Sequence, residues 1–423
     1  MSRILIRNAD WVVTVDDDRR IITDGAVEIV DDRIAFVGKS SELASGASHD
    51  EVIDARGHLV VPGFIDTHVH NTQHLGRGLG DGCDMPTLLL ERLYAYEAAM
   101  APDDAYWAAR LCQLELIKAG TTCYLDPSSY YPEETARATG DTGMRGIISR
   151  TALDVQNTRI GRLPRQSLFR ETTAEALERA EQTVVEYTNS FDGRVDAWFS
   201  IRIPVGCSDE LCRGIKQLAD KHGVGIVTHC CESQDQSVAS RRTSRYTDVE
   251  RLEALGVLGP EMVMIQMGWA NPEEIALAQR HKFKISYTPT TGYRIALGDA
   301  TFGHFPEMAA LGVTVALGGN SAMSSNHLDS AAQPVGEPHV QHAGRRRHRD
   351  RQRPGPHGER HRPDARRSAR VAGMPGAGGS PRRPDRLERA RAARLGGLVM
   401  RADPCWPDMG AGFSLQAGPA PKV

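Results

Sequence analysis

The sequence predicts an α/β protein: a (β/α)8, TIM-like barrel with a small amino-terminal β domain and an atypical tail rich in Arg, Pro and Gly. From Val61 onward, short apolar runs alternate with helical stretches, a pattern typical of βα units and a parallel sheet. The segment before Val61 reads as short strands separated by polar turns, and the composition changes abruptly after residue 330. These observations divide the chain into three parts.

Residues 1–61 are expected to form a small β-sandwich-like domain. The expected strands cover Ile4–Val15, Ala26–Val30, Arg33–Val37 and His58–Val61. Asp31 and Asp32 lie between two of them, where acidic residues favour a hairpin turn.

Residues 62–330 are expected to form the barrel. The eight expected strands lie near residues 62–68, 121–125, 145–150, 196–203, 224–229, 262–266, 282–287 and 313–318. Helical patterns separate them, including an amphipathic region over Thr87–Lys118, a helix over Glu175–Tyr187 and a helix that begins after Ser208 as its N-cap. In such a barrel the chemistry lies at the carboxyl ends of the strands, so functional residues are sought there.

Residues 331–423 form a low-complexity tail with three competing interpretations. This segment holds 19 Lys and Arg but 8 Asp and Glu, with no Ile, Tyr, Thr or Asn. An Arg-rich arm for nucleic acid is disfavoured, because aromatic residues for base stacking are not interleaved with the charges. A solvated, disordered extension is the second interpretation. We favour the third, a shifted reading frame of a GC-rich gene, because the composition breaks abruptly.

The overall composition indicates an ordinary globular protein. The chain has 423 residues, of which 40% are hydrophobic and 25% charged. No apolar run reaches the roughly 18 residues that a membrane span requires, and the amino terminus carries early charges unlike a signal peptide. We therefore expect a cytoplasmic protein without a membrane partner. The eight cysteines show no CxxC pair and are expected to be reduced.

Three histidines and one glutamate at strand ends indicate a metal site. His68 and His70 follow the first barrel strand, and their spacing of two places both side chains on one side of the strand. His229 ends the fifth strand, and Glu232 follows three residues later. Imidazoles bind one divalent metal, and a nearby glutamate can move protons to and from an attacking water. Cys230 and Cys231 are interpreted as buried small residues rather than ligands. His74 could either line the mouth of the barrel or lie on its outer rim.

These residues and several motifs resemble the amidohydrolase superfamily, in the branch of aminohydrolases and chlorohydrolases that act on nitrogen heterocycles. The resemblance covers residues 1–330. It implies that a further barrel helix and returning strands should follow residue 330, where no such pattern is readable, so the amino-terminal β domain is expected to be incomplete without carboxy-terminal strands and to expose sheet edges. Its motifs are Ile53–Gly57, Pro62–His70, Leu75–Gly78, Glu115–Thr122, His229–Ser233, Trp269–Ile275 and Ala316–Ser321. The branch includes methylthioadenosine/adenosylhomocysteine deaminases, guanine and cytosine deaminases, and triazine hydrolases.

The resemblance implies one divalent metal, zinc or iron, and a water activated by that metal. His68, His70 and His229 match the metal ligands of the family, and Glu232 matches its proton shuttle. The strand-eight aspartate of the family, which is both a ligand and a base, is Asn320 here. The strand-six histidine that orients the water is Gln266. An amide oxygen can contact a metal, but it carries no charge and cannot accept the proton of the water.

One further position departs from the family, and one feature is absent. Arg202 replaces the strand-four histidine that approaches the substrate, and Val195–Val205 contains no lysine for a second metal. The leading hypothesis is therefore a metal-dependent hydrolase that removes an exocyclic amino or equivalent group from a small heterocyclic substrate. The alternative is a catalytically impaired homologue that binds a small ligand without turnover. By resemblance we also expect a homo-oligomer, and nucleic acid is not an expected partner.

Overall fold

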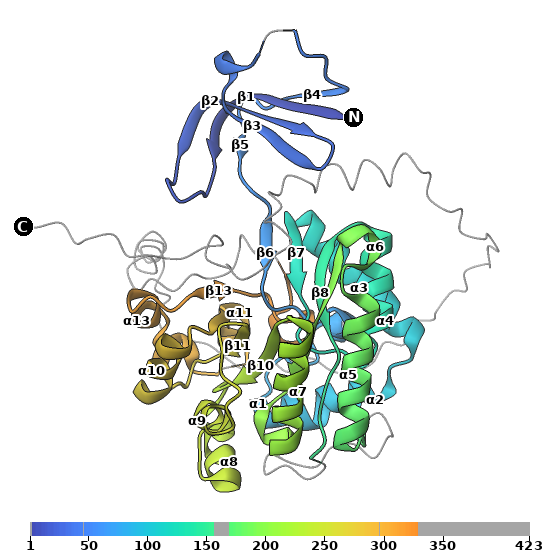
Figure 1. Cartoon of the computed structure of the whole chain (residues 1–423), viewed down its shortest axis with the longest axis vertical. Helices are drawn as coiled ribbons and strands as arrows, with labels where there is room; N and C mark the ends of the chain where they lie inside the picture. The colour runs from blue at the N-terminus through green and yellow to red at the C-terminus, as the bar shows by residue number, and fades with distance from the viewer. Residues whose placement is uncertain (1, 45, 156–168, 296, 329–423) are drawn as a thin grey trace, which may run out of the picture.

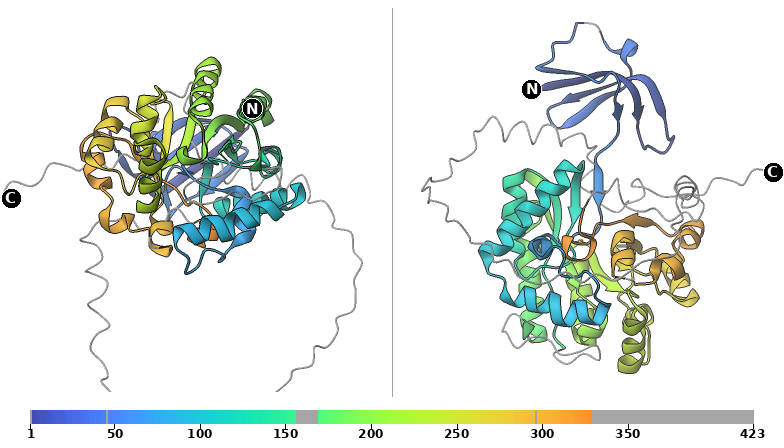
Figure 2. Two further views of the ribbon diagram at one scale, coloured as in Figure 1. Left: turned by 90° about the horizontal axis from the view of Figure 1, so that it is seen from below. Right: turned by 180° about the vertical axis from the view of Figure 1, so that it is seen from behind.

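The computed structural model describes residues 2–44, 46–155, 169–295 and 297–328. The interpretations of residues 331–423 and of Cys405 concern residues outside this part. Figure 1 shows two bodies, an amino-terminal sheet and a larger α/β barrel, joined by the segment that leads into strand β6. Figure 2 shows the same separation from behind. The predicted fold class, a TIM-like barrel preceded by a small β unit, is confirmed.

The amino-terminal unit is one mixed sheet in the order β3-β2-β1-β4, with β5 also paired to β1. Its strands are β1 (Arg3–Val13), β2 (Ile21–Val30), β3 (Arg33–Lys39), β4 (Glu51–Asp54) and β5 (Leu59–Val60). The expected hairpin at Asp31 joins β2 to β3, and Asp31 adopts a left-handed φ of 54° that acidic residues tolerate. Strand β4 was not expected. Strand β2 begins five residues before the expected start at Ala26, which was placed too late because the pair Asp24-Gly25 is typical of a turn.

A small apolar cluster holds this sheet together, while other apolar side chains remain exposed. Ile6, Val12, Val27 and Ile29 belong to the cluster. Trp11, Ile21 and Leu59, in contrast, are 50%, 65% and 54% exposed. The sheet therefore presents exposed apolar side chains, although the strands that carry them are paired with one another.

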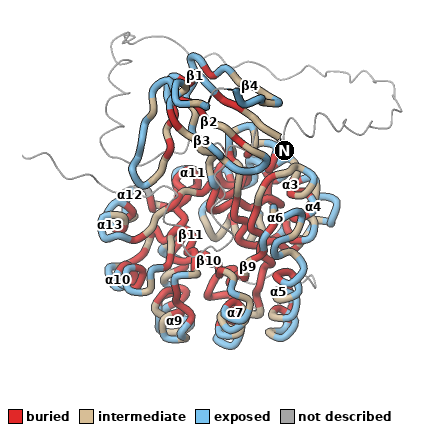
Figure 3. The backbone as a smooth tube through the Cα atoms, turned by 45° about the horizontal axis from the view of Figure 1, so that its top comes forward, coloured by how far each residue is buried: buried red, intermediate tan, exposed pale blue. Residues whose placement is uncertain are grey.

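The barrel has eight parallel strands in sequential order from β6 to β13. They are β6 (Phe64–Asp66), β7 (Thr121–Leu125), β8 (Arg145–Ser149), β9 (Val195–Ile201), β10 (Ile226–Cys230), β11 (Met262–Gln266), β12 (Lys284–Tyr287) and β13 (Val315–Leu317). Six of them lie within the expected ranges, whereas β9 begins and β10 ends one residue outside them. Figure 3 shows these strands as the buried centre of the molecule, surrounded by helices with exposed outer faces.

Hydrogen bonds between the first and last strands close the barrel. The Thr67 N–H donates to the Leu317 carbonyl at 3.2 Å, and the Asn320 N–H donates to the His68 carbonyl at 2.7 Å. The His70 N–H in turn donates to the Asn320 carbonyl at 2.7 Å. The seam of the barrel therefore runs through the same peptides that carry His68, His70 and Asn320.

The helices surround the barrel with start signals that the sequence carries. They are α1 (Met85–Thr87), α2 (Tyr94–Ala99), α3 (Pro102–Lys118), α4 (Pro132–Thr142), α5 (Thr173–Tyr187), α6 (Ser190–Gly193), α7 (Asp209–His222), α8 (Gln234–Ser244), α9 (Asp248–Ala254), α10 (Pro272–His281), α11 (Pro289–Arg294), α12 (Asp299–Phe302), α13 (Phe305–Ala310) and α14 (Ala322–Ser325). Ser208 caps α7 as predicted, because its side chain accepts from the Leu211 N–H.

The expected continuous region over Thr87–Lys118 is wrong in one respect. It is divided into a π-helix (Leu88–Leu93), α2 and α3. Ala101 is extended, with φ −103° and ψ 163°, because the following Pro102 disfavours a helical conformation in the residue before it. Pro102 then begins α3, where a proline is well tolerated. On the amino-terminal side of this break, α2 contributes Tyr94 to the pocket described below.

No helix in the described ranges is long and apolar enough to cross a membrane.

Candidate metal centre and substrate pocket

Three histidines converge at the carboxyl ends of β6 and β10. His68 and His70 follow β6, and His229 lies within β10. One ring nitrogen from each lies within 4.8 Å of those of the other two. The rings of His68 and His70 are 4.8 Å apart, and those of His68 and His229 are 5.0 Å apart. The structure thus brings together all three predicted imidazole ligands.

The surroundings keep these imidazoles neutral. Burial lowers the pKa of His229 to about 3, and the Arg202 guanidinium lowers it further. Burial, followed by the neighbouring imidazoles, lowers the pKa of His68 and His70 well below the usual value for histidine. Neutral imidazoles have lone pairs available, so the cluster is ready to bind a cation without first losing protons.

Hydrogen bonding fixes one ring and leaves the others unsatisfied. His229 Nδ1 lies 3.0 Å from the Arg202 carbonyl, which can only accept, so Nδ1 donates and Nε2 retains its lone pair. Both ring nitrogens of His68, and Nδ1 of His70, are buried without a hydrogen-bond partner among the described residues. Buried polar atoms without partners are rare in native proteins. A divalent metal would satisfy them, so the donor set fits a metal ion.

Asn320 lies where the resemblance places the strand-eight ligand. It follows β13, is buried, and lines the same pocket as His70 and His229. Its φ of 65° is left-handed, a conformation that asparagine tolerates better than most residues. Its side chain lies near enough to His68 to favour the charged form of that ring. The position can offer an amide oxygen, but no negative charge.

Glu232 lies beside the histidines as the predicted proton carrier. It is buried and lines the pocket together with His70 and His229. The pKa of Glu232 is raised to about 7, first by burial and then by the Asp299 carboxylate, while Gln266 and Arg202 act in the opposite direction. A carboxyl group that titrates near neutral pH can both donate and accept a proton under ordinary conditions.

Gln266 ends β11 and does not line the pocket directly. It is fully buried, with a φ of 75°, and neither atom of its amide has a hydrogen-bond partner among the described residues. A strained backbone and unsatisfied polar atoms occur together at functional sites. Gln266 influences the site through Glu232, whose pKa it lowers.

Arg202 is fixed in the pocket wall by a partner that sequence reasoning missed. Its guanidinium donates to Glu97 of α2 at 2.9 Å and lies 3.4 Å from the Thr151 hydroxyl. The rings of Tyr94 and Tyr130 flank it at 5.9 and 6.0 Å. An arginine at a buried strand end requires a carboxylate, and this chemical need is the signal that could have indicated Glu97.

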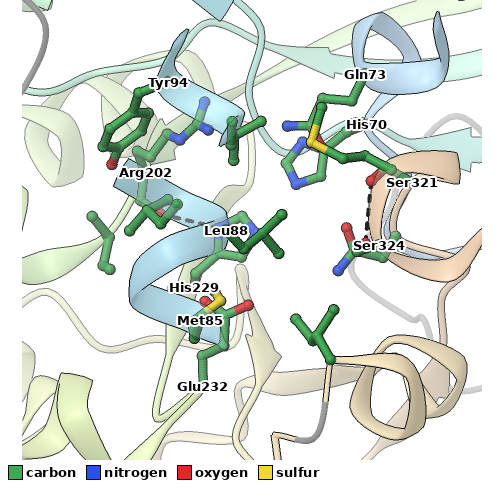
Figure 4. Close-up of a pocket in the computed structure, with 16 residues that line it drawn as sticks. His70, Gln73, Met85, Leu88, Tyr94, Arg202, His229, Glu232, Ser321 and Ser324 are labelled. Carbon is green, nitrogen blue, oxygen red and sulfur yellow. Dashed lines mark hydrogen bonds between the residues drawn. The ribbon is translucent and has the colours of Figure 1, made fainter. Parts of the chain in front are cut away.

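The pocket is lined by both polar and apolar side chains. Figure 4 shows Arg202 and Tyr94 on one side, Ser321 and Ser324 on the other, and Glu232 beside His229. The apolar wall consists of Met85, Leu88, Leu89, Leu93, Ile295 and Met323. Two segments far apart in the sequence, 71–90 and 288–305, both contribute residues to it. A flat ring that needs apolar contact on its faces fits such a wall.

The remaining candidate residues lie outside the centre. The Cys231 thiol donates to Glu274 at 3.2 Å, and neither Cys230 nor Cys231 joins the histidine cluster. His74 is buried beneath the mouth and contacts Glu115 at 3.0 Å. The seven cysteines in the described ranges are free thiols, as predicted.

Fold and site together define a parallel α/β barrel with a candidate histidine metal site at the carboxyl ends of its strands. The model of the Amidohydrolase family matches residues 59–332, and this chain belongs to that family. It is 29% identical over 329 residues to a 5'-deoxyadenosine deaminase of Methanosarcina acetivorans, covering 78% of this chain and 71% of that protein. It is 30% identical to a 5-methylthioadenosine/S-adenosylhomocysteine deaminase of Desulforamulus reducens, covering 78% and 72%.

Solved structures share the fold. A triazine hydrolase from Arthobacter aurescens superimposes with a TM-score of 0.71 at 22% identity, covering 78% of this chain and 74% of that one. An adenosine deaminase from Xanthomonas campestris with bound zinc gives a TM-score of 0.68 at 20% identity, covering 78% and 71%. The predicted family resemblance is therefore confirmed.

Proposed function

We propose that this protein is a metal-dependent hydrolase that removes an exocyclic amino or equivalent group from a small nitrogen heterocycle. One observation carries the proposal: three imidazoles have nitrogens within 4.8 Å of one another, and two of them, His70 and His229, line one pocket together with the buried Glu232. The deaminase names of the relatives support the reaction type, and the apolar wall supports a flat ring as substrate.

The residues divide the work as follows. His68, His70 and His229 would hold one zinc or iron ion, with the Asn320 amide oxygen within reach. When bound, the metal supplies Lewis acidity that lowers the pKa of a water molecule. Glu232 accepts the proton of the attacking water and returns it to the leaving nitrogen. Gln266 lies beside Glu232 and biases its protonation. Arg202 and the apolar wall orient the ring.

Two substitutions favour a second candidate, a homologue that binds a small heterocycle without turnover. Asn320 and Gln266 are both amides that cannot accept a proton, so Glu232 would handle protons alone. Removal of a positioned base costs on the order of 10²- to 10⁴-fold in rate. Both candidates are expected in the cytoplasm and share the same metal centre and pocket.

The test is a turnover assay on the full-length chain loaded with zinc or iron(II). Ammonia release is measured with aminated purines, pyrimidines and triazines, and binding of each compound is measured by calorimetry. Turnover that disappears in Glu232→Gln supports the hydrolase. Binding without ammonia release supports the second candidate, and neither binding nor release contradicts both.

A further inference from the structure

The turn that joins His229 to Glu232 has a strained backbone. Cys231 adopts a left-handed φ of 51°, although it is neither glycine nor asparagine. Such conformations cost on the order of 1–3 kcal/mol and persist only where surrounding contacts impose them. The turn directs Glu232 back into the pocket beside His229, since both residues line it. Something must therefore hold this backbone in place.

Two buried side chains bond the peptide groups of this turn. The Gln236 carbonyl oxygen accepts from the Glu232 N–H at 3.0 Å, and the Gln236 amide nitrogen lies 3.4 Å from the His229 carbonyl. The same nitrogen donates to Asp248. Asp248 also lies 3.5 Å from the Cys231 N–H. The backbone groups of both His229 and Glu232 are thus hydrogen-bonded to Gln236.

This pair of side chains, Gln236 and Asp248, is itself well fixed. Gln236 is 3% exposed and Asp248 is 1% exposed, so water does not compete for their hydrogen bonds. The Ser240 hydroxyl donates to the second oxygen of Asp248. Gln236 belongs to α8 and Asp248 begins α9, so the two helices after β10 meet at this point. Neither residue lines the pocket.

We propose that Gln236 and Asp248 are positioning residues that hold His229 and Glu232 in their working arrangement. They act through the backbone of the strained turn and do not touch a substrate. The inference rests on the proposed function for the roles of His229 and Glu232. A contrasting role would be a purely structural one, in which the pair only docks α8 against α9.

The first experiment follows the turn itself, without metal. Amide hydrogen exchange is compared in Gln236→Leu and in Val184→Ala, a control that removes buried packing in α5. Positioning predicts at least tenfold faster exchange over residues 229–232 in Gln236→Leu but not in the control. Faster exchange confined to α8 and α9 would show a purely structural role and overturn the proposal.

The second experiment measures the metal centre in the full-length chain with cobalt(II) as the probe. Outer hydrogen-bond partners of metal ligands typically change metal affinity by 10- to 100-fold. We expect Gln236→Leu to weaken cobalt binding within that range and to shift its visible absorption bands. The double variant Gln236→Glu with Asp248→Asn keeps an acceptor for the Glu232 N–H and a hydrogen bond between the two side chains, but it cannot donate to the His229 carbonyl, so it should recover only part of the affinity. Unchanged affinity and bands in Gln236→Leu would overturn the proposal.

The two experiments separate this inference from the proposed function. A chain that binds cobalt normally but turns over no heterocycle would contradict the hydrolase while leaving the cobalt comparison intact. A chain that binds no cobalt would contradict the proposed function, and hydrogen exchange would still decide the inference. If Gln236→Leu does not fold, Asp248→Asn takes its place in both measurements.

Discussion

The site has two halves that differ in charge chemistry. The half formed by β6 and β10 carries three imidazoles and a glutamate, His68, His70, His229 and Glu232. The half formed by β11 and β13 ends in two amides, Gln266 and Asn320. Both halves are buried, and both contain left-handed residues. The difference teaches that β6 and β10 supply both the imidazoles and the carboxyl group that can carry a proton, whereas β11 and β13 supply neutral amides, so the two halves can change separately.

The largest effect is expected from a substitution in the histidine half, because this half supplies the nitrogens that would bind the metal. His229→Ala removes one of three converging nitrogens, and we expect metal content to fall from about one ion per chain to less than about a tenth. Elemental analysis after zinc loading and desalting measures it. His222→Ala is the matched control, because this half-buried histidine pairs with Glu181 outside the site. If His229→Ala held as many metal ions per chain as the parent, His229 would not be a ligand of the metal.

The wall between the halves should be the next most sensitive feature. Arg202→Met leaves Glu97 buried without its partner, which typically costs about 3–5 kcal/mol of unfolding free energy. The double variant Arg202→Met with Glu97→Leu should be closer to the parent, because no charge is stranded. Urea unfolding measures both. Arg280→Met, at the more exposed pair with Glu253, should cost less than about 1 kcal/mol.

Because Glu232 is the titratable carboxyl group of the histidine half, the contribution of this residue to stability should depend on pH. Its pKa is raised from an ordinary 4.5 to about 7, so the folded protein retains this proton at pH values where the unfolded chain has lost it. The contribution of Glu232 to the free energy of unfolding therefore falls as the pH rises. We therefore compare the free energies of unfolding of metal-free Glu232→Gln and of the metal-free parent. The difference, variant minus parent, should increase by about 2 kcal/mol from pH 5 to pH 7.

Urea unfolding at several pH values measures that difference. The buried histidines and aspartates titrate in both proteins, so the comparison between parent and variant isolates Glu232. The exposed Glu178→Gln serves as a control and should follow the parent. A difference that does not change with pH would show that Glu232 is ionised throughout.

Restoring charge to the amide half should have the smallest but most informative effect. Asn320→Asp adds a negative ligand and a proton acceptor, and we expect turnover to rise at least tenfold, which corresponds to about 1.4 kcal/mol of barrier. The control is Asn326→Asp, because Asn326 is also left-handed, with φ 69°, but is exposed and outside the pocket. Normal metal binding without increased turnover would show that Asn320 is not the limiting departure.

The sequence was sufficient to locate the histidine half of the site. Alternation along a strand placed His68 and His70 together, and the rule that strand ends meet at one face of a barrel added His229. These arguments need only the local period and the fold class. The eight strands were found for the same reason, because each is a short apolar run between polar turns.

Contacts between helices and strand ends could not be predicted in the same way. Glu97 approaches Arg202 because the helical region breaks before Pro102, and no local pattern indicates which strand end it will meet. The left-handed backbone of Gln266 and Cys231 also has no sequence signal, because neither is glycine. Strand β4 was missed because it pairs in parallel with β1, a partner distant in sequence.

Because the barrel closes between its first and last strands, the proposed metal would also affect the stability of that closure. Thr67 and Leu317, which bond across the seam, are separated by 250 positions in the chain. An ion held by His68 on one side and reached by Asn320 on the other would act as a cross-link at the longest-range contact of the barrel. By mass action, a free metal concentration 100 times the dissociation constant would stabilise the closed barrel by about 2.7 kcal/mol. Depletion of metal would then loosen the seam before the interior strands, and the two ends of the barrel would separate first.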